Sequence, residues 1–124
     1  MLINSLYTIK DISYLENNTL LAEILLNKDH EIFKGHFPNH PIVPGVCLTN
    51  MITDVISTSK QKEFYLKAAA FIKFISLVQP NTNLELSIRI LISSENEQSV
   101  SADAVLFKEN TVFLKFKGTF ELIP

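Results

Sequence analysis

Cysteine is nearly absent from this sequence, because Cys47 is the only one among 124 residues. A lone cysteine cannot form an intrachain disulfide, which excludes the small secreted domains that depend on several such bonds. The first ten residues, MLINSLYTIK, contain neither a basic region nor a long apolar stretch, so they do not resemble a signal peptide. We therefore expect a protein of the reducing cytoplasm.

An excess of either charge is also lacking. Eleven Lys and Arg residues stand against thirteen Asp and Glu residues, which gives a formal net charge of −2, and no basic block occurs. This balance argues against nucleic acid or an anionic membrane as the main partner. No apolar run reaches the roughly 18–20 residues that a membrane-spanning helix needs, so no membrane span is expected.

The sequence shows no internal repeat, no low-complexity segment and no linker. We therefore expect a single domain over residues 1–124. Hydrophobic residues make up 47% of the chain, which is at the upper end of the usual range. A small domain this apolar often uses the surplus at a subunit interface or in a tunnel for an apolar ligand.

Period-two alternation of apolar and polar residues predicts strands over much of the chain. It is clearest in residues 84–92, 99–107 and 111–122, which are separated by short turns. Residues 63–78, EFYLKAAAFIKFISLV, predict either two strands or one long bent strand. Residues 19–29 alternate as well, although their Leu, Ala and Glu content also suits a helix; the ENN turn before them favours a strand.

The period changes to that of a helix between Gly45 and about Ser59. Apolar residues recur there at i, i+3, i+4, i+7 and i+8 and form one apolar face: Leu48, Met51, Ile52, Val55 and Ile56. The opposite side carries a narrow polar stripe of Thr49, Asn50, Thr53, Asp54 and Ser57. The order of strand, loop, long helix and further antiparallel strands predicts an α+β fold, with a sheet wrapped around one central helix and assembled as a dimer.

A loop rich in proline and glycine leads into this helix and carries His36. Three prolines and two glycines between Gly35 and Gly45 fix an irregular path with few backbone donors. The imidazole can act as a base near neutral pH, and free N–H groups at the helix start can bind a carbonyl oxygen. Many histidines in such loops, however, are packed or capping residues rather than catalysts.

The other histidines do not strengthen a catalytic or metal-binding interpretation. His30 and His40 are interpreted as loop residues. The irregular spacing of positions 30, 36 and 40 shows no clear second shell for a metal ion. We therefore expect neither a metal nor another cofactor.

The segment GHFPNHPIVPGVCLTNMI resembles the signature of the hotdog-fold 3-hydroxyacyl-acyl-carrier-protein dehydratases of the FabZ and FabA kind. That family shows a His-Phe-Pro loop, a Pro-Val-x-Pro-Gly-Val segment and then a central helix. Its rigid residues recur here at the same spacing: His36, Phe37, Pro38, Pro41, Pro44, Gly45 and Val46. The segment FIKFISLVQPNTNLEL also resembles the family's strand with a basic residue before a proline turn. The predicted order of elements agrees with a hotdog fold along nearly the whole chain.

The resemblance implies a dimer with two composite active sites. In such a site the loop histidine of one subunit removes the α-proton of a 3-hydroxyacyl thioester on acyl carrier protein. An acidic helix residue of the other subunit protonates the departing β-hydroxyl. Carried onto this sequence, the base is His36, and the amide of Gly45 holds the thioester carbonyl. Three neighbours would contact the substrate: Phe37, Pro44 and Val46.

The acid's position, fourteen residues after the histidine, is occupied by Asn50. An amide donates a hydrogen bond but cannot give up a proton, and general acid assistance is typically worth roughly 100- to 10,000-fold. Asp54 lies one turn further along the stripe and is a candidate donor through a water that Thr49 and Thr53 would order; a solvated carboxylate is the alternative. Cys47 is a candidate thiolate near the helix start, with a small buried hydrophobe as the favoured interpretation.

Three functions remain open. The first is a dehydratase for fatty acid or specialised aryl-polyene-type lipid synthesis, expected as a homodimer or a larger oligomer. The second is a non-catalytic or half-site acyl-carrier-binding subunit, such as one half of a heterodimer with a related dehydratase. A hotdog thioesterase is the third. Because acyl carrier proteins are usually acidic, four lysines near the helix and loop are candidate docking residues: Lys34, Lys60, Lys62 and Lys73.

Overall fold

The fold is taken from a computed structural model that describes residues 3–35 and 39–124. His36 and Phe37, predicted to belong to the site, lie outside the described residues. The elements follow in the order β1 (Tyr7–Leu15), β2 (Thr19–Leu26), α1 (Ile32–Gly35), α2 (Gly45–Lys60), β3 (Phe64–Phe74), β4 (Glu85–Glu95), β5 (Ser99–Lys108) and β6 (Thr111–Leu122).

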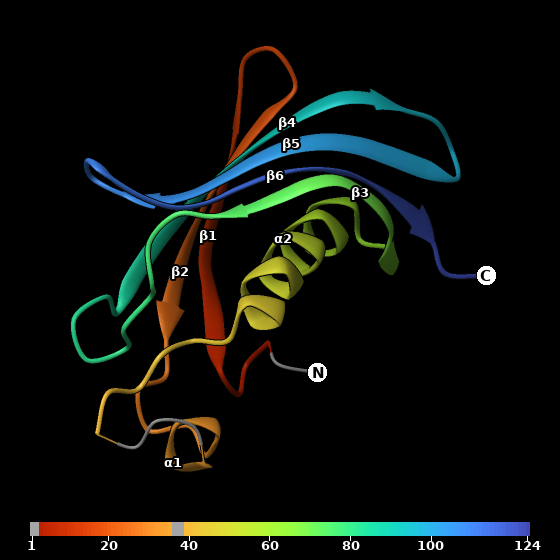
Figure 1. The fold of residues 1–124 in the computed structure, drawn as a ribbon. Coiled ribbons are helices and arrows are strands. Elements are labelled where there is room, and N and C mark those ends of the chain that lie inside the picture. Colours follow the sequence, from red (N-terminus) through yellow and green to blue (C-terminus); the bar gives the residue numbers. More distant parts are fainter. Residues whose placement is uncertain (1–2, 36–38) are drawn as a thin grey trace.

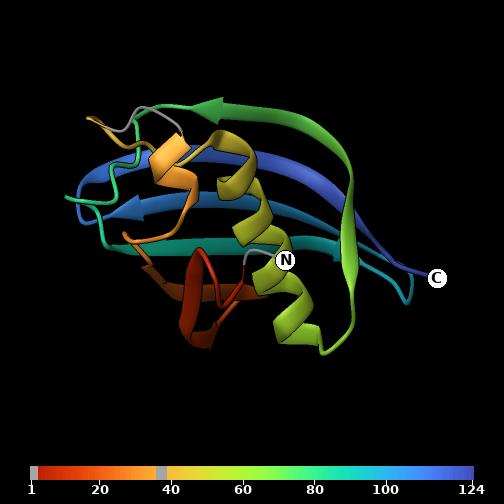
Figure 2. The same cartoon turned by 90° about the horizontal axis from the view of Figure 1, so that it is seen from below.

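The strands form one antiparallel sheet in the order β1-β2-β4-β5-β6-β3. The sheet curves around α2, which lies against its concave side (Figures 1 and 2). This is the predicted hotdog arrangement, and the helix begins at Gly45 as expected. No helix in the two described ranges is long and apolar enough to cross a membrane.

The helix is held by the apolar face that its sequence period predicted. All five predicted residues of that face are buried, and Cys47 is buried with them. The inward side chains of the central strands complete the core, among them Ile88 of β4, Leu106 of β5 and Phe116 of β6. Burial of this face leaves only the polar stripe and the two helix ends for other contacts.

One strand, β1, was not predicted from the sequence. Its inward residues Tyr7 and Ile9 occupy odd positions. A register shift between Ile9 and Asp11 then makes Ile12, at an even position, the cross-strand partner of Ala22. A bulge of this kind inserts an extra residue and breaks the period-two pattern. The alternation is therefore too short on either side of Lys10 to be recognised.

The strand β3 lies at one edge of the sheet, and only β6 pairs with it. Residues 63–78 thus form one strand followed by an irregular segment, rather than two strands. Two register shifts interrupt its pairing, between Leu66 and Ala68 and between Ala69 and Phe71. Most of its side chains are exposed. An edge with free backbone groups and exposed side chains is a natural place for another chain to pair.

Truncating the buried helix face should be costly. Ile52 is fully buried in α2, so Ile52→Ala should lower the free energy of unfolding by about 2–5 kcal/mol through lost apolar contacts and a cavity. Thr58→Ala, at an exposed position of the same helix, is the control and should change it by less than about 0.5 kcal/mol. Urea denaturation measures both, and equal small effects would contradict the placement of the helix.

Candidate functional site

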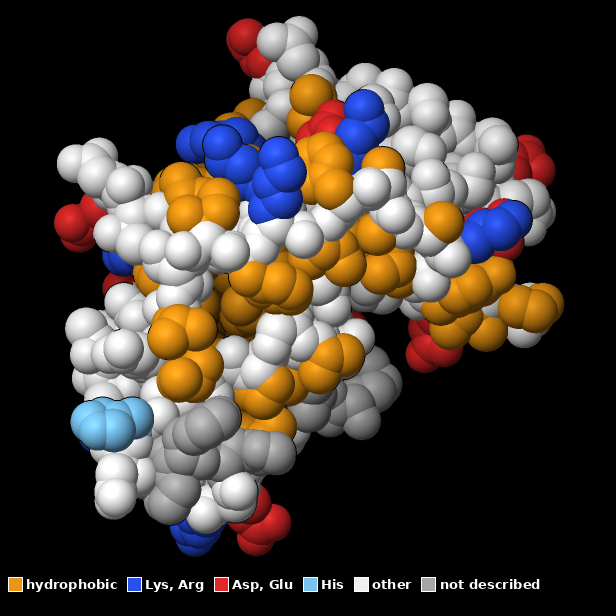
Figure 3. Space-filling model, viewed as in Figure 1, with side chains coloured by type: hydrophobic (Ala, Val, Ile, Leu, Met, Phe, Trp, Pro, Cys, Tyr) orange, Lys and Arg blue, Asp and Glu red, His pale blue; other side chains and the backbone are white. Residues whose placement is uncertain are grey.

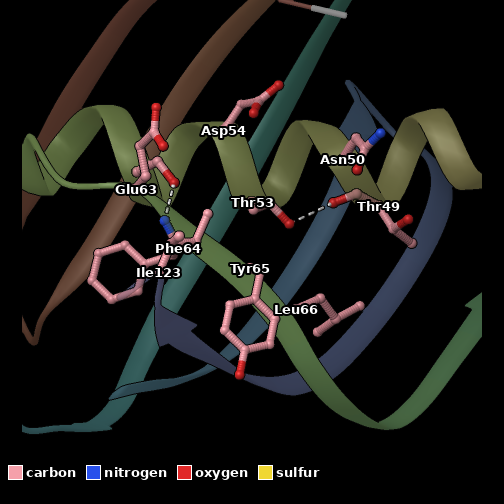
Figure 4. Close-up of a pocket in the computed structure, with 10 residues that line it drawn as sticks. Thr49, Asn50, Thr53, Asp54, Glu63, Phe64, Tyr65, Leu66 and Ile123 are labelled. Carbon is pink, nitrogen blue, oxygen red and sulfur yellow. Dashed lines mark hydrogen bonds between the residues drawn. The ribbon is translucent and has the colours of Figure 1, made fainter. Parts of the chain in front are cut away.

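The polar stripe of α2 opens onto a cavity of about 380 Å³, here called the stripe cavity. The helix forms one wall, and the start of β3 with the end of the chain forms the other (Figure 4). All five residues of the predicted stripe line it, together with Glu63, Phe64, Tyr65, Leu66 and Ile123. Glu63, an exposed carboxylate in the turn before β3, belongs to no sequence motif that marks it as a site residue.

Three hydroxyls of the stripe are already engaged. Thr49 donates to the carbonyl of Val46 at 2.9 Å, and Thr53 donates to the carbonyl of Thr49 at 3.4 Å. The Ser57 hydroxyl accepts the N–H of Phe64 at 3.1 Å and so fixes the start of β3 beside the helix. With their protons committed to the helix, the two threonines retain only acceptor capacity for a water in the cavity.

Asn50 lies on the exposed part of the stripe. No hydrogen bond of its carboxamide to any described residue is present. Its N–H₂ group is therefore available to donate to a bound hydroxyl, and its oxygen to accept. This position can orient a substrate hydroxyl, but it holds no titratable proton.

Asp54 makes the contact that the sequence did not predict. Its Oδ2 accepts a hydrogen bond from the hydroxyl of Tyr7, which comes from β1 and is buried. In Figure 4 the Asp54 side chain projects away from Tyr65 and Leu66 of β3. A buried tyrosine hydroxyl needs a partner, but no local pattern identifies one that is 47 residues away in the sequence.

The environment of this pair favours the protonated forms. Burial raises the pKa of the Asp54 carboxyl above its ordinary value, and the hydrogen bond from Tyr7 lowers it in part. Burial and the neighbouring carboxyl also raise the pKa of Tyr7 well above its usual range. Asp54 therefore holds a proton more tightly than a solvated aspartate does, as a group that acts as an acid must.

A second, more apolar cavity of about 320 Å³ lies at the start of α2 and is called the helix-start cavity. The loop before the helix forms one side, and the segment after β3 forms the other. The N–H of Val43 donates to the carbonyl of Val78 at 2.9 Å and joins the two sides. Pro44 is the N-cap and supplies no side-chain cap. The N–H of Cys47 donates to the carbonyl of Pro44 at 3.0 Å, which leaves the amides of Gly45 and Val46 for a ligand.

Gly45 lies in close contact with the ring of Phe74. A Cβ on this residue would lie 2.7 Å from two ring atoms of Phe74, so any larger residue must displace that ring. The ring of Phe74 is 57% exposed and Val46 is 68% exposed, which leaves apolar surface beside the free amides. Phe74 is a site neighbour that the sequence analysis did not single out.

The remaining candidates have structural roles. Burial raises the pKa of the Cys47 thiol, and its side chain belongs to the core, so it is the small hydrophobe that was favoured. Nδ1 of His30 accepts the N–H of Ile32 at 3.0 Å just before α1. Within residues 3–35 and 39–124, no three His, Cys, Asp or Glu side chains come together as a set of metal ligands.

Gly45 and Asp54 lie well apart within one chain. Gly45 and Asp54 are nine residues apart on the same helix, which corresponds to about 14 Å along its axis. The helix-start cavity meets the end of β3 at Phe74, whereas the stripe cavity meets its beginning at Phe64. A substrate whose carbonyl is bound at Gly45 therefore lies far from Asp54 of the same chain.

Solved structures share this architecture. The chain is similar to the dehydratase heterocomplex ApeI:P from Xenorhabdus doucetiae, with a TM-score of 0.68, 18% identity and coverage of 94% of this chain and 96% of that one. A thioesterase superfamily protein from Shewanella loihica gives a TM-score of 0.59 at 14% identity, over 94% of this chain and 91% of that chain. At these identities the likeness concerns the fold alone.

Sequence comparisons identify the family. The chain is 29% identical over 98 residues to the 3-hydroxyacyl-acyl-carrier-protein dehydratase FabZ of Lactiplantibacillus plantarum, over 73% of this chain and 65% of that protein. For the FabZ of Pediococcus pentosaceus the identity is 31%, over 63% of this chain and 57% of that protein. The chain thus spans less than two thirds of the length of these relatives. The model of the ApeI-like family, described as ApeI dehydratase, matches residues 12–113, and the chain belongs to this family.

Proposed function

We propose that this protein dehydrates (3R)-hydroxyacyl thioesters on acyl carrier protein to trans-2-enoyl thioesters. The pathway would be fatty acid synthesis or a specialised lipid pathway of the aryl-polyene type. The observation that carries the proposal is the α2 stripe, in which Asn50 and Asp54, whose carboxyl pKa is raised by burial, line one cavity of a dehydratase-family fold. The FabZ relatives support acyl carrier protein as the source of the substrate.

In the proposed reaction the thioester carbonyl accepts a hydrogen bond from the amide of Gly45, which increases the acidity of the α-carbon. His36 removes the α-proton, and the electrons of that C–H bond form the new double bond. The β-C–O bond breaks as the hydroxyl leaves. Asn50 donates a hydrogen bond that orients this hydroxyl, and Asp54 supplies through a water the proton that completes the departing water molecule.

The spacing of these groups supports a site made by two chains. Antiparallel pairing of two β3 edges about their midpoint would bring Phe64 of one copy opposite Phe74 of the other. The stripe cavity of each copy would then adjoin the helix-start cavity of its partner. This arrangement would remove the separation of about 14 Å between Gly45 and Asp54 within one chain.

A half-site subunit is the second candidate function. Asn50 at the acid position favours it, because a partner chain that carries a carboxyl group there would restore direct protonation. The ApeI:P complex of Xenorhabdus doucetiae is a dehydratase heterocomplex, which supports a partner of the same kind for this chain. In that case His36 and Gly45 of this chain would form a composite site together with the acidic residue of the partner chain.

Hydrolysis of the thioester is the third possibility, since a thioesterase superfamily protein shares the fold. Hydrolysis releases a free thiol and leaves the β-hydroxyl in place. Dehydration leaves the thioester intact and creates a conjugated double bond. Thiol titration and ultraviolet absorbance of the same reaction therefore separate the two activities.

The base should be the residue whose loss matters most. We expect the wild-type protein to form enoyl thioester from a 3-hydroxyacyl thioester on acyl carrier protein, and His36→Ala to lower the rate roughly 100- to 10,000-fold. His40→Ala, an exposed histidine in the same loop, is the matched control and should keep the wild-type rate. Ultraviolet absorbance follows the product.

The Asn50 position separates the first two candidates. An active wild-type protein supports the self-sufficient dehydratase. A silent wild-type protein that gains turnover as Asn50→Glu supports the half-site subunit. Silence of the wild type, His36→Ala and Asn50→Glu together would contradict a catalytic role for His36.

Removing the Tyr7 hydroxyl should make Asp54 a weaker acid. In Tyr7→Phe the hydrogen bond that lowers the Asp54 pKa is lost while burial remains, so that pKa should rise further. Carbon-13 NMR titration of the carboxyl measures the shift, with Asp54→Asn identifying the signal. An unchanged or lower pKa in Tyr7→Phe would contradict the pairing.

The same shift predicts how stability depends on pH. Because the folded-state pKa of Asp54 lies above its unfolded value of about 3.9, the folded state binds this proton more tightly. Its stabilising effect is full below the unfolded value and is lost as pH rises through the folded pKa. Wild type should therefore lose stability relative to Asp54→Asn across that interval in urea denaturation. A constant difference between the two proteins across that interval would count against a raised pKa.

A further inference from the structure

The face of the sheet that points away from α2 carries a group of cations, here called the outer basic patch. Its members are Lys73, Arg89, Lys115 and Lys117, and all four are exposed. The strand register places Lys73 of β3 opposite Lys115 of β6, which is followed by Val105 and then Arg89 in one row across the sheet. Figure 3 shows Lys and Arg side chains gathered over the sheet with hydrophobic side chains around them.

These cations differ from the other lysines of the sheet in forming no ion pair with any described residue. Four lysines elsewhere form ion pairs with glutamates: Lys10, Lys60, Lys67 and Lys108. Among the described residues, no ion pair involves a member of the outer basic patch. Lys73 and Arg89 instead lie over the rings of Phe71 and Phe107, at 5.2 and 4.8 Å from the ring centres.

The arrangement includes a repulsive pair. Lys73 and Lys115 are direct cross-strand partners, and like charges in this position destabilise a sheet. Asp103, the cross-strand partner of Lys117, is the acidic residue beside them. An anionic surface placed over the row would relieve this repulsion. A second copy of the chain packed face to face would bring cations against cations, so self-association does not fit this face.

The surroundings suit a protein surface. Phe71 is 39% exposed and Leu91 is 41% exposed, so apolar side chains lie between the cations. Aromatic residues and arginine are enriched in protein interfaces, and Phe71 and Arg89 supply both here. One end of the row also reaches the candidate site, because Lys73 precedes Phe74, whose ring packs on Gly45.

We propose that the outer basic patch docks the acidic surface of the acyl carrier protein. This inference rests on the proposed function, and it changes the docking site expected from the sequence. Of the four lysines expected to dock, only Lys73 belongs to the patch. Lys60 pairs with Glu95 at 2.5 Å and is committed within the chain. Arg89, Lys115 and Lys117 replace the others.

Direct binding tests the patch without any reaction. Fluorescence anisotropy would follow labelled holo-acyl carrier protein titrated with wild type, Lys115→Glu and Lys28→Glu. We expect Lys115→Glu to bind roughly tenfold more weakly and with a smaller salt dependence, since one attraction becomes a repulsion. Lys28→Glu makes the same charge change at an exposed turn before α1 and should bind like wild type.

The midpoint of thermal unfolding tests whether a loss of folding causes the weaker carrier binding of Lys115→Glu. Lys115→Glu places a carboxylate opposite Lys73 and replaces a like-charge pair with an opposite-charge pair. Its midpoint should therefore equal or exceed that of wild type while carrier binding falls. Wild-type affinity in Lys115→Glu would overturn the proposal, as would a loss confined to Lys34→Glu or Lys62→Glu.

Activity assays test carrier docking on the patch separately from the proposed dehydratase activity. With 3-hydroxyacyl thioester on the carrier, Lys115→Glu should lower kcat/KM roughly tenfold, and with the same acyl group on free pantetheine it should change nothing. Carrier binding through the patch by a protein that turns over neither substrate would support docking and overturn the dehydratase assignment. Binding of wild type to anionic vesicles through Lys115, with none to the carrier, would overturn docking.

Discussion

Burial of one face of α2 in the curved sheet is the constraint on which the rest of the structure depends. Apolar residues occupy that face completely, and the inward side chains of the strands close over it. The helix can therefore present polar groups only along its narrow stripe and at its uncapped first turn. A cavity lies at each of these two places, so the packing that stabilises the fold also leaves room for a ligand beside the polar groups of the helix.

The rigidity of the same helix separates the two places. A continuous helix holds Gly45 and Asp54 about 14 Å apart along its axis, and no side-chain rotation removes that distance. A reaction that needs a carbonyl-binding amide and a proton donor within a few ångströms therefore requires groups from two chains under our proposal. The exposed edge strand β3, which contacts both cavities at its opposite ends, offers a means of bringing them together.

Regular periods in the sequence predicted most of this architecture. The helix from Gly45, its apolar face and its stripe follow from spacing alone, as do the strands β4, β5 and β6, because each buries one face against a single core. The strand β1 escaped prediction because a bulge near Lys10 interrupts its alternation. The Tyr7–Asp54 contact and the packing of Phe74 on Gly45 join residues far apart in the sequence, so only the folded chain shows them.

Asn50 and Asp54 together define the chemical question that this site poses. The usual acid position holds a group that orients but does not protonate. One turn further, burial raises the pKa of the Asp54 carboxyl, which accepts a hydrogen bond from the buried Tyr7. The most direct measurement is complementation between His36→Ala and Asp54→Asn proteins, each inactive alone under the proposal, mixed so that dimers exchange. Restored enoyl formation in the mixture is the predicted result, because one site of each mixed dimer keeps both groups. Mixed dimers that form, as native mass spectrometry would show, yet remain inactive would contradict the composite site.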